Sequence, residues 1–227
     1  KYRKNLLLAR WGRRALTRYT LSRRGATFRA TEHVLLEGLD QARPVGVTVG
    51  RGGHIYVTIA YMAANEGSPV YRSDLVMIRR RGERRTAVPR AYDVVSAAAD
   101  RLWRELASGA SWRARRAYVE LLRRGRSVLG EAPDRLRATT AGSPAFPHLV
   151  WLAAVAARDG HVPQAAAIEQ LLGLAHADDV ESRVLACRAL SECLPAEPSV
   201  GPLWRQALSD TDPRVRHAAI VARRALP

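Results

Sequence analysis

Cysteine is scarce in this chain of 227 residues, which contains only two. Cys187 and Cys193 lie six positions apart, a spacing that fits neither a Cys-x-x-Cys motif nor a zinc site, and no haem-attachment motif is present. Free cysteines outside such motifs pack as small apolar side chains. The two cysteines therefore predict buried core residues, and they do not identify a redox compartment.

Aromatic residues and long apolar runs are also scarce. Aromatic side chains make up 6% of the chain, whereas the hydrophobic fraction of 47% is sufficient for a core. The longest apolar runs, residues 6–9 and 150–157, fall well short of the roughly 18 residues that a membrane-spanning helix requires. We expect no membrane span. The chain begins at Lys1, and its first apolar run is too short for a signal peptide, so we expect part of a longer or a processed protein.

Acidic residues are few, and the charge is unevenly placed. The chain has 37 basic and 21 acidic residues, a net charge of +16. Residues 1–90 carry +13 of this charge, and residues 91–227 carry +3. All basic residues except Lys1 and Lys4 are arginines. High-GC codon usage accounts for such a bias, and an anionic partner such as nucleic acid is the functional alternative.

Residues 1–80 have the hydrophobic period of strands. Val45, Val47 and Val49 alternate with smaller or polar residues, and a glycine-rich segment at 50–53 supplies the turn of a hairpin with residues 54–59. Further strands are expected at 5–9, 16–21, 27–37 and 75–79. Residues 81–90 are arginine-rich and without apolar period, which indicates a linker.

Residues 91–227 have helical period and an internal repeat. The segment 106–122 resembles the segment 208–226 at an offset of about 101 residues, and 174–190 is a looser copy about 34 residues before the last. Three steps of this size span the outer copies, so the pattern predicts four stacked helix pairs, an α-solenoid. Solenoids generally present binding surfaces.

Several residues of these helices have expected roles. We expect Ser111 and Asp212 to be N-caps, the latter followed by Pro213 at the first helical position. The expected core residues are Leu106, Trp103, Val215 and Ile220.

A search for chemistry finds no catalytic residue, no cofactor-binding residue and no metal ligand. The chain lacks a nucleophile–histidine–acid order, a phosphate-binding loop and a dinucleotide fingerprint. Asp178, Asp179 and Glu181 could suggest a metal site, but acids at a helix N-terminus, where the macrodipole favours them, are the simpler interpretation. No cofactor is expected, and whether the chain belongs to an enzyme stays open.

Two families are similar to parts of this sequence. Asp212-Pro213-x-Val215-Arg216-x-Ala218 resembles the second helix of a HEAT repeat, a likeness that extends over about residues 93–226. Arg43-Pro44 to Gly50, followed by Gly52-Gly53-His54-Ile55-Tyr56-Val57, is similar to a blade of the six-bladed propellers of quinone-dependent sugar dehydrogenases, although Gly52 and Ile59 replace two aspartates of that motif. The resemblance implies an α+β chain with two incomplete blades at 1–80, a linker at 81–90 and HEAT-like repeats at 91–227. It also implies a periplasmic or other extracytoplasmic location.

Three functions follow as hypotheses. The first is a non-catalytic scaffold that binds protein partners, such as the rest of its own propeller, as a subunit of an assembly. The second is the C-terminal part of a sugar dehydrogenase whose active site lies upstream. The third is nucleic-acid binding through arginine, against which the nearly neutral charge of the helical half argues.

Overall fold

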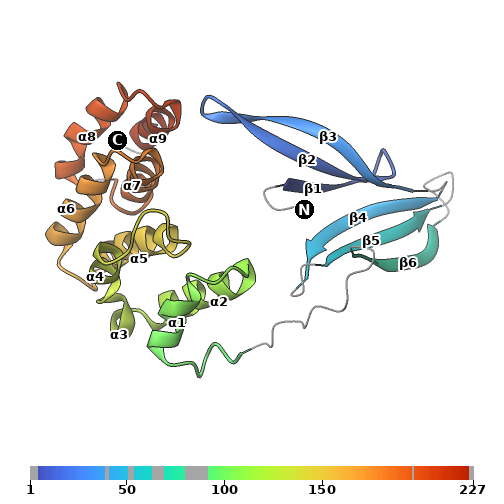
Figure 1. Ribbon diagram of the computed structural model, residues 1–227, viewed down its shortest axis with the longest axis horizontal. Helices are drawn as coiled ribbons and strands as arrows, with labels where there is room; N and C mark the ends of the chain where they lie inside the picture. Colours follow the sequence, from blue (N-terminus) through green and yellow to red (C-terminus); the bar gives the residue numbers. More distant parts are fainter. Residues whose placement is uncertain are drawn as a thin grey trace. The chain divides into compact units, whose positions relative to one another are not determined.

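The computed structural model describes residues 5–38, 41–50, 54–62, 69–79, 92–195 and 197–224 (Figure 1). The chain divides into two compact units, Lys1–Ala91 and Tyr92–Pro227. The expected linker at 81–90 and the glycine turn at 51–53 lie outside the described residues.

The first unit contains two antiparallel sheets of three strands each. The first sheet has the order β1-β2-β3 and the second has the order β4-β5-β6. The strands are β1 (Asn5–Arg10), β2 (Ala15–Arg24), β3 (Thr27–Glu37), β4 (Ala42–Val49), β5 (Ile55–Met62) and β6 (Pro69–Ile78). Gly25, with a φ of 59°, closes the tight turn between β2 and β3, a conformation that glycine adopts without strain.

A small core joins the two sheets of this unit. Its buried residues are Leu16 from β2 and Ile55, Val57 and Ile59 from β5. The β5 residues lie two positions apart, so they share one face of their sheet. Partly buried side chains from the neighbouring strands, among them Leu7 of β1, surround them.

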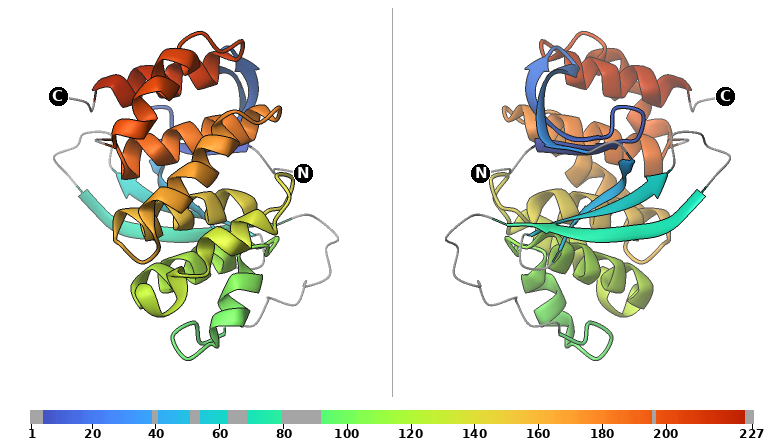
Figure 2. Two further views of the ribbon diagram at one scale, coloured as in Figure 1. Left: turned by 90° about the vertical axis from the view of Figure 1, so that its left-hand side faces the viewer. Right: turned by 90° about the vertical axis from the view of Figure 1, so that its right-hand side faces the viewer.

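The second unit is helical. Its elements are α1 (Ala99–Glu105), α2 (Ser111–Arg124), α3 (Arg126–Leu129), α4 (Ala132–Arg137), α5 (Phe146–Arg158), α6 (Gln164–Ala175), α7 (Val180–Cys193), the 3₁₀ helix η1 (Pro198–Val200), α8 (Gly201–Ala207) and α9 (Pro213–Arg224). Helix α7 packs against α5, α6 and α9, and α8 packs against α9 (Figure 2). One continuous core runs through these helices and is rich in alanine, which permits close helix packing.

The predicted fold class, propeller blades followed by an α-solenoid of HEAT-like hairpins, is wrong. The described strands form two small three-stranded sheets, and within the described residues there is neither a closed barrel nor a propeller. The helices range from the four residues of α3 to the fourteen of α7, which is not a regular array. Only the coarser α+β mixture holds. Alternation and turn residues specify pairing between neighbouring strands, but they contain no information on how sheets are arranged around an axis.

Two of the residue roles expected in the helices also need correction. Ile220 was expected in the core, but it is 48% exposed, whereas Leu106, Trp103 and Val215 are buried as predicted. Ser111 is the first residue of α2 and Ala110 is its N-cap, with the backbone N–H of Ala110 donating to Ser108 Oγ. Asp212 is confirmed as a cap, because its Oδ1 accepts the backbone N–H of Arg214 at 2.8 Å.

Candidate protein-binding surface

One face of the first sheet is apolar and exposed. The pairing register places Leu6 opposite Tyr19, and Leu8 opposite Thr17, which in turn lies opposite Val34. Directly opposed residues of antiparallel strands project from the same face. By the same alternation, five exposed large apolar residues share this face, which we call the outer face: Leu6 (52% exposed), Leu8 (46%), Leu21 (40%), Phe28 (50%) and Val34 (57%).

The opposite face of the same sheet is where the core lies. Leu7 and Leu16 alternate with the residues of the outer face and pack against Ile55, Val57 and Ile59 of the second sheet. A strand that is apolar on both faces needs cover on both. Within the described residues, the inner face of β1 and β2 receives this cover. On the outer face Thr17 and Ala15 are buried, whereas Leu6, Leu8 and Leu21 are not. The consecutive run Leu6-Leu7-Leu8 was the signal in the sequence that could have indicated this.

The second sheet repeats this pattern on a smaller scale. Leu75 and Met77 of β6 are 67% and 45% exposed. They lie opposite Thr58 and Tyr56, the residues of β5 that alternate with its buried positions. The sheet therefore covers one face with its own core and leaves the other in contact with solvent.

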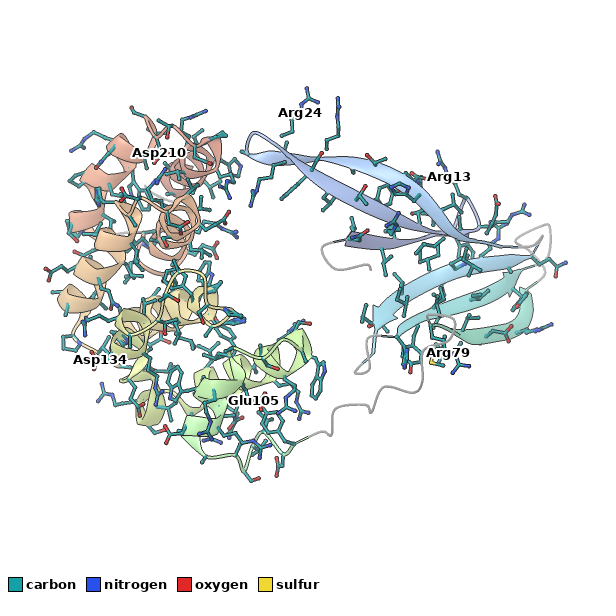
Figure 3. The ribbon with its side chains drawn as sticks, viewed as in Figure 1. Arg13, Arg24, Arg79, Glu105, Asp134 and Asp210 are labelled. Atoms are coloured by element: carbon teal, nitrogen blue, oxygen red, sulfur yellow. The ribbon has the colours of Figure 1, made fainter. Side chains whose placement is uncertain are left out.

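Arginines dominate the charge around these faces. The described residues of the first unit include ten basic residues, all arginine, and three acids, Glu32, Glu37 and Asp74. At the tip of the β2–β3 hairpin, Arg23 lies over the ring of Phe28 at 5.4 Å from its centroid, and the neighbouring Arg24 projects beyond the ribbon (Figure 3). The outer face thus combines apolar side chains with arginines, which we call its positive rim: Arg10 and Arg13 beside Glu32, and Arg23 at the hairpin tip. Tyr19 and Glu32 lie on the same face, in the cross-strand row of Leu6.

Two of the three acids are already engaged. Glu32 forms ion pairs with Arg10 at 2.8 Å and with Arg13 at 3.1 Å, and it accepts the hydroxyl of Tyr19 at 2.7 Å. The hydrogen bond from Tyr19, followed by the two guanidinium groups, lowers the pKa of the Glu32 carboxyl. Asp74 accepts the hydroxyl of Tyr61 at 2.6 Å, and this bond raises the pKa of Tyr61. The rim network is charged at neutral pH and leaves a net positive surface.

The acids that could have suggested a metal site have structural roles. Asp179 caps α7, because its Oδ2 accepts both the backbone N–H and the hydroxyl of Ser182 at 2.8 Å. Glu181 pairs with Arg214. Within the described residues no group of three or more histidine, cysteine or acidic side chains could hold a metal ion. Cys187 and Cys193 are free thiols and buried, as predicted.

A hollow of about 470 Å³ lies between α6, α7, α8 and α9. Arg183, Asp210 and His176, which line this hollow, form hydrogen bonds with other groups of the protein. Arg183 and Asp210 form a bidentate pair at 2.9 and 3.1 Å, and His176 contacts the backbone oxygen of Leu172 and the side-chain oxygen of Gln206. This arrangement braces neighbouring helices.

Comparison with protein-family models, curated protein sequences and solved structures gives no match for this chain. No helix in the described part of the chain has the length and apolar character needed to cross a bilayer. The outer face is therefore interpreted from its own chemistry.

Proposed function

We propose that this chain is a non-catalytic protein-binding segment whose outer face docks onto a partner protein. The observation that carries the proposal is the grouping of Leu6, Leu8, Leu21, Phe28 and Val34 on one face, each at least 40% exposed. Soluble domains rarely leave contiguous apolar patches uncovered, and large ones mark interaction sites.

The chemistry of the face favours a protein over a nucleic acid. Four of the five residues are aliphatic, and single-stranded nucleic acid is held mainly by bases that stack on aromatic rings. The arginines of the rim would assist nucleic-acid binding, but they do not require an aliphatic centre. The dehydrogenase alternative depends on the resemblance alone, since no residue of this chain was assigned to its chemistry.

The charge of the rim specifies the partner further. A face with apolar residues and arginines is matched by a surface with apolar residues and carboxylates. The arginines can bind such carboxylates with two parallel hydrogen bonds, which lysine cannot do. We therefore expect an acidic partner surface.

A pair of variants on one strand tests the proposal. Val34→Glu introduces a negative charge on the outer face, and Thr31→Glu introduces the same charge on the opposite face of β3, where Thr31 is also exposed. The partner is captured from the native source by the full chain, purified, and titrated by calorimetry. We expect Val34→Glu to weaken binding by about tenfold or more, as for a central interface residue, and Thr31→Glu to change it less than about twofold.

Two results would refute the proposal. One is equal weakening by both variants, because a general charge effect would then account for the loss. The other is tight binding of a 20-base-pair DNA duplex that falls steeply with salt and is insensitive to Val34→Glu, which would assign the surface to nucleic acid.

A further inference from the structure

Helices α7 and α9 occupy equivalent positions in two copies of one structural unit. In α7, Arg183 donates from one guanidinium nitrogen to the backbone oxygens of Ala177 and Asp178, at 3.0 and 2.8 Å. In α9, Arg216 donates in the same way to the backbone oxygens of Asp210 and Thr211, at 2.6 and 2.9 Å. Each bond spans the same six or five positions, so α9 repeats α7 at an offset of 33 residues, the separation of Glu181 and Arg214.

Helix α9 covers a defined face of α7. The two helices pack together, and Cys187 of α7 is fully buried. Two ion pairs fix the register. Arg183 of α7 binds Asp210, which lies in the turn before α9, and Glu181 of α7 binds Arg214 of α9. The face of α7 that α9 covers thus has a small apolar residue, Cys187, and two charged residues. Arg183 pairs with the turn before α9, and Glu181 pairs with α9 itself.

The equivalent face of α9 has no cover within the described residues. Ile220 is the equivalent of Cys187, and it is 48% exposed instead of fully buried. Arg216 is the equivalent of Arg183, but it pairs with none of the carboxylates in the described part of the chain. Val221 is different, because it is exposed and so is its equivalent, Arg188. Exposure of Val221 is ordinary, whereas exposure of Ile220 marks a vacant contact position.

We propose that α9 is a second docking surface, which receives an acidic helix of a partner protein in the way that α7 receives α9. The charges select this occupant. Arg214, Arg216 and His217 lie in the first turns of α9, and Arg214 occupies the position equivalent to Glu181 of α7. Arg214 is already held by Asp212 and Glu181, so the cation left for a partner is Arg216, whose described contacts are backbone oxygens. A second copy of the same helix would bring like charges together, whereas a helix with a carboxylate opposite Arg216 would pair with it. This surface is separate from the outer face of the first sheet, and it does not depend on the proposed function.

A copied segment of the chain itself can serve as the helix that docks on α9 in a test. A copy of residues 195–227 appended after Pro227 continues the 33-residue offset, so its helices would meet α9 as α8 and α9 meet α7. The copied segment keeps Asp210, so that its carboxylate can pair with Arg216 of the parent chain. It carries Arg214→Glu, so that it brings no like charge toward Arg214 of the parent chain. Because the probe is tethered, its effective concentration is high, and weak docking becomes measurable.

Thiol labelling reports whether the face is covered. Ile220→Cys places an exposed thiol at the vacant position, and Val221→Cys is the matched control one residue away; the native Cys187 and Cys193 are buried. In the extended chain, we expect labelling at position 220 to slow by about tenfold or more relative to the unextended chain, as for a site that reacts only after local opening. Labelling at position 221 should be unchanged.

Specific outcomes would overturn the proposal. The proposal is overturned if position 220 is labelled as fast in the extended chain as in the unextended chain. This result means that α9 does not accept a complementary helix pair, whether the appended segment remains unfolded or folds elsewhere. Equal slowing at positions 220 and 221 indicates nonspecific cover and also overturns it. A copy with Arg214 unchanged and Asp210→Asn should lose the protection, and if it protects equally well, the acidic partner is refuted.

Discussion

Removing the ion pair between Arg183 and Asp210 tests quantitatively how the helices of the second unit are held together. Both side chains are largely buried, at 14% and 15% exposure, and their two hydrogen bonds measure 2.9 and 3.1 Å. Asp210→Asn removes the charge but keeps an oxygen that can still accept the backbone N–H of Asp212. The loss is therefore confined to the charged contacts, and we expect it to lower the free energy of unfolding by about 2 kcal/mol.

Urea denaturation followed by the helical circular dichroism signal measures this loss. The midpoint should fall without a change in slope, because the surface exposed on unfolding is the same. Asp178→Asn is the matched control. Its carboxylate is exposed, and the described contacts of Asp178 with Arg183 use the backbone oxygen alone. The control should change stability by less than about 0.5 kcal/mol. Equal effects of the two variants would refute the role of the pair.

The same variant has a defined dependence on pH. The hydrogen bond from Arg183 is the main cause that lowers the pKa of Asp210 below that of an unfolded aspartate. A carboxyl with a lowered folded-state pKa stabilises the fold fully above its unfolded pKa of about 3.9, and this contribution disappears as the pH falls through the folded-state value. The difference between wild type and Asp210→Asn should therefore be constant near neutrality and shrink in acid. A difference that grows in acid would contradict the assignment.

Three further predictions concern other positions. Burial raises the pKa of the Cys187 thiol to about 11, so a thiol reagent at pH 8 should modify it only after unfolding, and prompt reaction would contradict its burial. Leu190→Ala, at a fully buried position, should cost about 2–5 kcal/mol in urea denaturation, whereas Ile220→Ala should be nearly neutral. Hydrogen bonds from Arg123 and Arg124 lower the pKa of Glu120 to about 2, so Glu120→Gln should be less stable than wild type above about pH 4.5, with the difference vanishing toward pH 2.

The local elements were predictable from the sequence. Expected strands at 5–9, 16–21 and 27–37 correspond to β1, β2 and β3. Periodicity and turn residues determine such elements because each depends on neighbours within a few positions. Asp212, expected as an N-cap, accepts the backbone N–H of Arg214 at the start of α9. These signals are local, and they succeeded.

The arrangement of elements and the exposed apolar faces were not predictable in the same way. Ile220 has the apolar character and helical spacing of a core residue, and only the structure reveals that no described helix covers it. Leu6 and Leu8 likewise look like ordinary core residues of a strand. Hydrophobicity indicates that a position favours burial, but whether the same chain provides the cover is a property of the tertiary structure.

The positive charge of the first unit leads to a test that separates its two physical contributions. Exposed charges act at a distance and are screened beyond about 8 Å at physiological salt, whereas apolar contacts form only after docking. Raising the salt concentration should therefore slow association of the acidic partner with the outer face and leave dissociation nearly unchanged. Val34→Glu should instead accelerate dissociation, because the exposed Val34 contributes to the apolar centre and not to the rim. If salt and Val34→Glu changed the same rate constant, the apolar residues and the arginine rim could not have the separate roles that we propose for them.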